Sequence, residues 1–168
     1  MDNSIEQKQI SELLGMKFFI PSYQRGYRWT EQQVRDLLND VNEFKPQKQN
    51  ESGEETWYCL QPLIVRKMDE TDVRLSNEEN KKEWYEVIDG QQRLTTVFLI
   101  IHYFNEMWIG KIKQKLPVIR YQTRDDSFSF LNSLEINIET DFVKYDSDSA
   151  FIDHYYMAQA YNEIHRWV

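Results

Sequence analysis

The chain has 168 residues, of which 40% are hydrophobic, 29% charged and 14% aromatic, and its formal net charge is −8. This composition excludes a disordered chain, and the length fits a domain that can bury roughly two-thirds of its unfolded surface. The negative charge excludes a general attraction of nucleic acid to the whole surface, so any contact with DNA must use a local basic patch.

The first third of the chain predicts two helices around a short strand. Apolar residues between Ile5 and Leu14 indicate a first short helix, and residues 17–20 indicate a strand that stops at Pro21. Residues 22–29 follow as an ordered loop. Thr30 and Gln33 then have the spacing of a capping box, and the apolar residues after them recur on one face of a helix: Val34, Leu37, Leu38, Val41 and Phe44.

The middle of the chain predicts a hairpin. Residues 45–56 are polar and are typical of a mobile surface loop, whereas residues 58–68 have the apolar content of a strand. Pro62 confines the start of that strand to a sheet edge or a bulge. If residues 84–88 pair with it, the hairpin delivers Asp89 to one end of a sheet.

A junction follows at residues 84–97, Trp-Tyr-Glu-Val-Ile-Asp-Gly-Gln-Gln-Arg-Leu-Thr-Thr-Val. We expect a strand that breaks at Asp89 and Gly90, a turn, and a helix that starts at about Leu94. The helix is apolar nearly all round, which indicates a central, buried position, and we expect it to end near Gly110.

The last part of the chain predicts a strand at residues 118–121 and a helix capped by Asp125 or Asp126, with an acidic, irregular stretch at residues 137–148. From about Ser149 a further amphipathic helix carries Phe151, Tyr155, Ala158, Asn162 and His165. We expect residues 1–145 to form one domain and residues 146–168 to begin a helical segment that leads to a C-terminal region absent from this chain; a docked terminal helix is the alternative.

One cysteine and the hydropathy limit the setting of the protein. Cys59 stands alone, which excludes an internal disulfide and a cysteine-based zinc cluster, and we expect a reducing, cytoplasmic setting. No apolar stretch is long enough for a bilayer, and the segment after Met1 does not resemble a signal peptide, so we expect no membrane insertion and no secretion.

The chemistry of the junction indicates a phosphate-binding loop. Gly90 lets the backbone approach a ligand closely, and the free N–H groups of the helix start favour an anion. Arg93 adds a planar donor fork suited to phosphate, and Thr95 and Thr96 add hydroxyls. The alternative is a turn whose polar side chains only cap the helix and pair with each other.

A second cluster, residues 21–29, places two arginines among three aromatic rings. Stacking and cation–π contacts suit this mixture, so the loop could offer a platform for a base or ribose together with an arginine for phosphate. The alternative is a loop that Tyr23 and Trp29 anchor to the core, with Arg25 in an ion pair.

Taken together, Ile-Pro-Ser-Tyr-Gln-Arg-Gly-Tyr-Arg-Trp (20–29) and Val-Ile-Asp-Gly-Gln-Gln-Arg-Leu-Thr-Thr (87–96) closely resemble the N-terminal domain of GmrSD-type restriction endonucleases. The resemblance extends to residues 121–125. It implies an α+β fold of the ParB/sulfiredoxin-like type, in which a small mixed sheet packs with several helices. It also implies that the domain binds or hydrolyses a nucleoside triphosphate with a divalent ion, Mg²⁺, and is coupled to a C-terminal nuclease domain that acts on foreign or modified DNA.

The resemblance also suggests roles for single residues. Gly90 and the helix start would hold phosphates, Arg93 would neutralise them, Asp89 would hold Mg²⁺ or its waters, and Gln91 or Gln92 would orient an attacking water. The expected catalytic set is Asp89, Gln91, Gln92 and Arg93, and the expected nucleotide-binding set is Tyr23, Gln24, Arg25, Gly90, Arg93, Thr95 and Thr96.

Two departures from related proteins limit these roles. Sulfiredoxins need a cysteine beside the turn, where this chain has glutamines, and no His-Asn-His pattern is present, so we expect neither sulfinic acid repair nor DNA cleavage by these residues. Three functions stay open: a regulatory NTPase domain of a phage-defence restriction protein, a nucleotide-gated binding module without turnover, and an interaction domain with an empty pocket.

Overall fold

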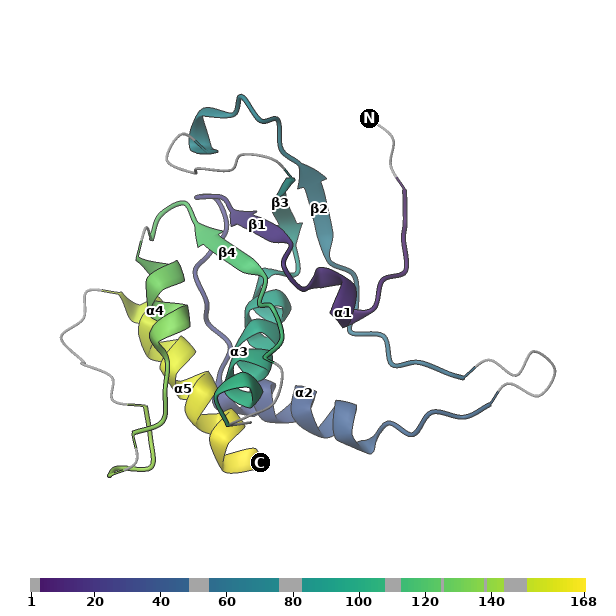
Figure 1. Cartoon of the computed structure of the whole chain (residues 1–168), viewed down its shortest axis with the longest axis vertical. Helices are drawn as coiled ribbons and strands as arrows, with labels where there is room; N and C mark the ends of the chain where they lie inside the picture. Colours follow the sequence, from purple (N-terminus) through teal and green to yellow (C-terminus); the bar gives the residue numbers. More distant parts are fainter. Residues whose placement is uncertain are drawn as a thin grey trace.

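The computed structural model describes residues 4–48, 55–75, 83–107, 113–124, 126–137, 139–143 and 151–168. Within these ranges, four strands form one mixed sheet in the order β2-β3-β1-β4 (Figure 1). The strands are β1 (Lys17–Ile20), β2 (Ile64–Lys67), β3 (Trp84–Asp89) and β4 (Val118–Tyr121). Strand β1 is parallel to both β3 and β4, and β2 is antiparallel to β3. The hairpin of β2 and β3 was predicted correctly.

Helices cover one face of the sheet, and the predicted α+β class is confirmed (Figure 1). They are α1 (Ile10–Leu13), α2 (Glu31–Glu43), α3 (Gln91–Met107), α4 (Ser127–Ser133) and α5 (Ile152–Trp167), and a short 3₁₀ helix, η1, spans Val73–Leu75. No helix in the described ranges combines the length and the apolar character that crossing a bilayer requires. The ParB/sulfiredoxin-like topology stays a prediction.

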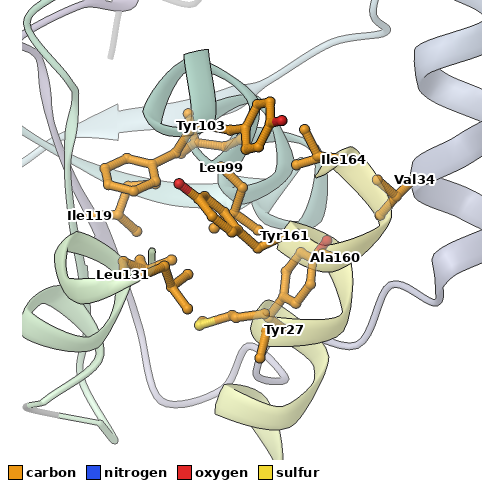
Figure 2. Close-up of a cluster of buried hydrophobic side chains, with 14 of the residues drawn as sticks. Tyr27, Val34, Leu99, Tyr103, Ile119, Leu131, Ala160, Tyr161 and Ile164 are labelled. Carbon is orange, nitrogen blue, oxygen red and sulfur yellow. The ribbon is translucent and has the colours of Figure 1, made fainter. Parts of the chain in front are cut away.

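The main core lies between the sheet and the helices, and its buried residues come from β1, β3, β4, the helices α2 to α5 and the loops between them. Figure 2 shows part of this core. Fully burying one large apolar side chain stabilises a fold by about 1.5–3 kcal/mol. The labelled members come from the β1–α2 loop, α2, α3, β4, α4 and α5: Tyr27, Val34, Leu99, Tyr103, Ile119, Leu131, Ala160, Tyr161 and Ile164. A smaller cluster of Phe19, Met68, Leu75 and Trp84 covers the other face. The sheet therefore has an apolar layer on both sides.

The start of α2 was predicted correctly. The capping box forms, since the N–H of Thr30 donates to Oε1 of Gln33 at 3.0 Å. Val34, Leu37 and Leu38 are buried as expected, whereas Val41 is half exposed. The buried stripe of α2 thus ends at Leu38, before the predicted members Val41 and Phe44.

The predicted start of α3 at Leu94 is wrong, because the helix begins at Gln91, directly after Gly90. Gly90 has φ +93°, so one residue completes the turn, and the N–H of Leu94 already donates to the Gly90 carbonyl at 3.0 Å. Ten residues of α3 are buried, which confirms its central position. The described helix ends at Met107, and Gly110 lies outside the described residues.

The strand predicted at residues 58–68 is much shorter, since only Ile64–Lys67 pairs with β3. Gln61 has φ +70° and Pro62 lacks an N–H, so neither suits a regular ladder. The expected edge position is confirmed, because β2 is the outermost strand of the sheet. Much of the loop predicted at residues 45–56 lies outside the described residues.

The C-terminal elements agree with the prediction in part. Asp126 stands at the N-cap of α4 without a side-chain capping bond, and Asp125 lies outside the described residues, as does half of the stretch 137–148. In α5, Tyr155 is 44% exposed, so the buried face is rotated from the predicted one. Helix α5 packs against α2 and α3. The domain boundary at residue 145 stays a prediction.

Candidate functional site

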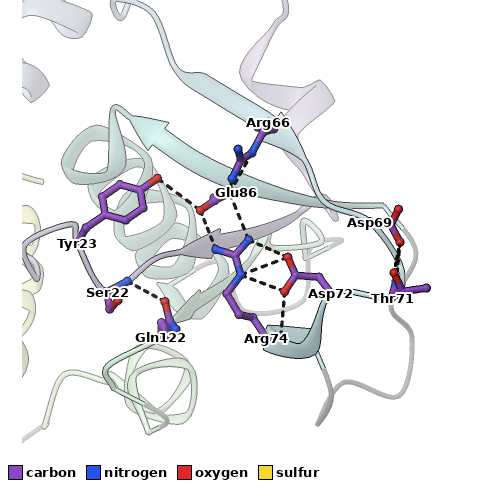
Figure 3. A network of polar contacts seen from close by, with 9 residues as sticks. All are labelled: Ser22, Tyr23, Arg66, Asp69, Thr71, Asp72, Arg74, Glu86 and Gln122. Atoms are coloured by element: carbon purple, nitrogen blue, oxygen red, sulfur yellow. Dashed lines mark hydrogen bonds and ion pairs between the residues drawn. The ribbon is translucent and has the colours of Figure 1, made fainter. Parts of the chain in front are cut away.

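The loops that follow three strands meet at one edge of the sheet. Because β1, β3 and β4 are parallel, their carboxyl ends share this edge, here called the carboxyl edge. The N–H of Ser22, in the β1–α2 loop (residues 21–30), donates to Oε1 of Gln122 at 2.9 Å (Figure 3). The Nε2 of Gln24 donates to the Ile88 carbonyl at 2.6 Å. These bonds join the loop to β3 and to the segment after β4.

Gly90 allows α3 to start at the carboxyl edge. A Cβ at this position would lie 3.0 Å from Cδ1 of Leu63 and 3.2 Å from the Pro62 carbonyl oxygen, and φ is positive. In the described part of the chain, the N–H groups of Gln91, Gln92 and Arg93 have no hydrogen-bond partner. The start of α3 therefore presents unpaired donors and the positive end of a helix dipole.

The two glutamines of the motif hold the β1–α2 loop. Gln92 uses both ends of its amide, because Nε2 donates to the Gly26 carbonyl at 3.0 Å and Oε1 accepts from the Arg28 N–H at 2.8 Å. Nε2 of Gln91 donates to the Arg25 carbonyl. Both side chains are buried, and Oε1 of Gln91 is buried without a partner among the described residues. The two amides thus act as peptide-like partners for the loop backbone.

Thr95 and Thr96 lie behind the turn, in the core. Both are fully buried, and their hydroxyls lie 2.8 Å from Oη of Tyr121 and 2.9 Å from Oη of Tyr27. Burial raises the pKa of both tyrosines well above the ordinary value. The structure thus joins these two predicted site residues to the core and not to the surface of the carboxyl edge.

Arg93 faces the segment that precedes β2. Its Nη1 donates to Oε1 of Gln61 at 2.9 Å, and its Nη2 donates to the Pro62 carbonyl at 2.7 Å. A guanidinium has five N–H donors, so further donors remain for a ligand. Arg93 therefore both braces this segment and keeps its charge beside the start of α3.

Three predicted site residues are exposed at the carboxyl edge. The side chain of Tyr23 is 65% exposed, and Arg25 and Asp89 are also exposed. Within the described ranges, the charged groups of Arg25 and Asp89 have no partner. A cation, a carboxylate and an aromatic ring are thus available next to the helix start.

Sequence reasoning missed the polar network around Glu86, on the face of β3 opposite the helices (Figure 3). Glu86 is 1% exposed and accepts from Arg66 and from Nη1 of Arg74 at 2.8 Å, and Oη of Tyr23 donates to it at 3.4 Å. Burial alone would raise the pKa of Glu86, but the hydrogen bonds from Arg74 and Arg66 outweigh it and lower the pKa. Glu86 is thus held as a paired carboxylate. Its place in the middle of an apolar strand was the available signal.

Sequence reasoning also missed Asp153, in the first turn of α5. Its carboxylate is buried, pairs with Nη1 of Arg28 and lies 3.2 Å from Nε of Arg124. The signal in the sequence was an acid on the otherwise apolar face of an amphipathic helix. The carboxylate links α5 to two of the loops at the carboxyl edge.

The described residues contain no cluster of three or more His, Cys, Asp or Glu side chains that could hold a metal ion. Mg²⁺ does not need such a cluster, because it commonly binds through one or two carboxylates together with substrate phosphates and water. The exposed Asp89 fits that mode of binding.

A family model described as GmrSD restriction endonuclease, N-terminal domain, matches residues 5–167. The match includes the β1–α2 loop, the Asp89–Arg93 motif and α5. The search of curated proteins finds no match to the chain.

Proposed function

The chain belongs to the family of GmrSD restriction endonuclease N-terminal domains, and from this premise we propose that it binds a nucleoside triphosphate with Mg²⁺ and hydrolyses it as the regulatory domain of a DNA-targeting restriction protein. The observation that carries the proposal is the arrangement at the carboxyl edge. Among the described residues, the start of α3 presents unpaired N–H groups there, beside the exposed side chains of Arg25 and Asp89, whose charged groups have no partner.

Each group at this edge suits one part of a magnesium–triphosphate complex. The N–H groups of Gln91, Gln92 and Arg93 would bind phosphate oxygens, because a helix N-terminus favours anions. Arg25 would bind a phosphate from the loop side, and Asp89 would hold Mg²⁺ or its waters. Tyr23 offers an exposed ring for stacking on a base, a contact that tolerates every base.

The chemical step needs a positioned water, and we assign this role to Gln91 rather than to Gln92. Both amide atoms of Gln92 are engaged by the β1–α2 loop, whereas Oε1 of Gln91 has no partner in the described part of the chain. That oxygen is buried, so a water could reach it only if the loop moved. Hydrolysis would therefore require a loop displacement after the triphosphate binds.

The pairing of Glu86 favours a second candidate function, a nucleotide-gated binding module without turnover. Glu86 is paired with two arginines and its pKa is lowered, so it does not suit the role of general base. In this alternative, binding alone would change the β1–α2 loop and its contacts.

We also propose that cleavage of DNA belongs to a C-terminal nuclease region of the full-length protein. The sequence has no His-Asn-His pattern, and the net charge of −8 disfavours contact with DNA through the whole surface. This domain would then regulate the nuclease and would contact DNA only as part of the full-length protein.

The test is a calorimetric titration with each of the four ribonucleoside triphosphates plus Mg²⁺, together with an assay of phosphate release. Arg25→Ala and Asp89→Ala should each weaken binding at least about tenfold. Lys67→Ala is the matched control. Lys67 is exposed on β2, and its backbone lies opposite Tyr85, near the amino end of β3 and away from the carboxyl edge. This variant should bind like the unmodified protein.

The outcomes separate the candidate functions. If the protein binds a triphosphate and releases phosphate, and if Arg25→Ala and Asp89→Ala both weaken binding, the NTPase is supported. Binding without release supports the gated module. If the folded protein binds none of the four triphosphates, the proposal is refuted and an interaction domain with an empty pocket becomes the leading explanation.

A further inference from the structure

Asp153 ties α5 to the loops of the carboxyl edge. It lies in the first turn of α5 and is 1% exposed. Arg28 reaches it from the β1–α2 loop, and Nε of Arg124 lies 3.2 Å away in the segment after β4. A buried carboxylate without a partner is costly, so moving either arginine away from Asp153 would cost free energy.

Gly26 packs against the same carboxylate. A Cβ at residue 26 would overlap both oxygens of Asp153, so a side chain here would force α5 and the loop apart. On its other side, the loop is held by Gln92 of α3, through the Gly26 carbonyl and the Arg28 N–H. The segment from Gly26 to Arg28 is therefore clamped between α3 and α5.

This clamp sets the position of Arg25. The carbonyl of Arg25 accepts from Gln91, and the next residue is Gly26, so the backbone that follows its Cα is fixed while the guanidinium remains exposed. We propose that Asp153 is a positioning residue, which holds Gly26 and Arg28 so that Arg25 faces the ligand and which couples the carboxyl edge to α5. The role of the ligand in this statement rests on the proposed function.

Such coupling works in both directions. A ligand whose phosphate draws Arg25 toward it would strain the contacts among Gly26, Arg28 and Asp153. If ligand binding changes the equilibrium position of α5 by some factor, fixing α5 in its new position changes the affinity for the ligand by the same factor. Helix α5 would therefore transmit the occupancy of the carboxyl edge to whatever it contacts.

The experiment compares two substitutions of equally buried acids on α5. Asp153→Asn removes the charge at the clamp. Glu163→Gln is the control, because Glu163 is also 1% exposed but pairs with Arg35 of α2, at 2.6 Å, and with Arg166, away from the loop. Two quantities are measured: the hydrogen-exchange rate of the Arg28 amide, and the affinity for the triphosphate that gives the largest heat in the titration with Mg²⁺.

Both variants should lower the melting temperature, which a purely structural role also explains. Only Asp153→Asn should speed exchange of the Arg28 amide and weaken triphosphate binding, by at least about fivefold, the lower end of typical coupling between sites. If Asp153→Asn does not fold, Arg124→Gln removes a partner that is 27% exposed and should shift both quantities in the same direction.

The proposal is overturned if Asp153→Asn and Glu163→Gln change affinity equally, or if exchange of the Arg28 amide stays at its original rate. If the unmodified protein binds no triphosphate, the proposed function fails. The exchange measurement then decides the positioning role alone, since a faster rate supports the clamp and an unchanged rate removes it.

Discussion

At the level of single residues, the motif Asp89–Arg93 divides into groups that face a ligand and groups that hold the fold. Asp89 is exposed and has no side-chain partner in the described ranges, whereas both amide atoms of Gln92 bind the β1–α2 loop. Arg93 does both, because it keeps free donors while it braces Gln61 and Pro62. Substitutions within one short motif should therefore have different effects on stability.

Arg93→Ala should lower the free energy of unfolding by about 1 kcal/mol, because two hydrogen bonds to the segment before β2 are lost. Arg25→Ala should stay within about 0.5 kcal/mol of the unmodified protein, because the guanidinium is exposed and has no partner in the part of the chain that the structure describes. Urea unfolding of the three proteins measures both values. Equal stability of the two variants would show that the contacts of Arg93 contribute nothing.

His102 should make the fold sensitive to acid. Burial lowers the pKa of its imidazole, and the nearby Glu106 only partly offsets that effect. The unfolded chain then binds a proton that the folded chain excludes, so stability is full above the ordinary pKa of about 6.5 and falls as the pH is lowered.

The variant His102→Leu isolates this contribution. Unfolding by urea between pH 7.5 and 5.5 should show a smaller loss of stability in the variant than in the unmodified protein. His154, whose pKa burial also lowers, contributes with the same sign in both proteins and cancels in the comparison. Identical pH profiles would contradict the assignment to His102.

At the level of elements, the buried carboxylate of Glu86 connects three segments on one face of the sheet, beside the apolar cluster of Phe19, Met68, Leu75 and Trp84. Glu86 of β3 holds Arg66 of β2 and Arg74 of η1, and Arg74 also pairs with Asp72 at 2.7 Å (Figure 3). This network fixes the segment with η1, which covers the face of the sheet opposite the α-helices. Loss of this network should increase local opening of that segment before it affects the main core.

Glu86→Gln should destabilise the protein by about 1–3 kcal/mol, less than for a fully buried ion pair because both arginines are partly exposed. Amide exchange in residues 69–75 should rise more than exchange in α3. Asp72→Asn is the control, since Asp72 pairs only with Arg74 among the described residues, and it should cost less. A larger loss from Asp72→Asn would place the centre of the network elsewhere.

At the level of the whole molecule, α5 joins parts of the chain that are far apart in sequence. It supplies Ala160, Tyr161 and Ile164 to the main core (Figure 2). Its buried acids pair with Arg28 and Arg35. The fold of the preceding residues thus depends on this helix. This dependence bears directly on the expected domain boundary at residue 145.

Removing residues 151–168 should abolish the cooperative thermal transition, because the core loses one of its walls and Arg28 and Arg35 lose their partners. Circular dichroism and the dispersion of amide resonances measure the result. Tyr155→Ala, at an exposed position of α5, is the control and should melt near the original temperature. A folded remnant would instead support a domain that is complete at residue 145.

Local patterns were enough to predict several elements and the motif. The capping box of α2, the apolar character of α3 and the strand at Val118–Tyr121 depend on neighbouring residues, and periodicity and capping report such local preferences directly. The residue types of Asp89–Arg93 likewise indicate an anion site through their chemistry alone. The exact start of α3 escaped, because a single glycine with positive φ replaced the longer turn that was expected.

Only the tertiary structure decided which polar groups are free and which are used. Gln92 binds Gly26, Glu86 binds Arg66, and Asp153 binds Arg28, and each pair joins elements that are separated along the chain. Hydropathy and spacing cannot name such partners, because burial and pairing depend on which elements meet in space. The sequence by itself determined the elements and the chemistry of the carboxyl edge, and packing decided that Arg25 and Asp89 are the charged groups left exposed there without partners in the described ranges.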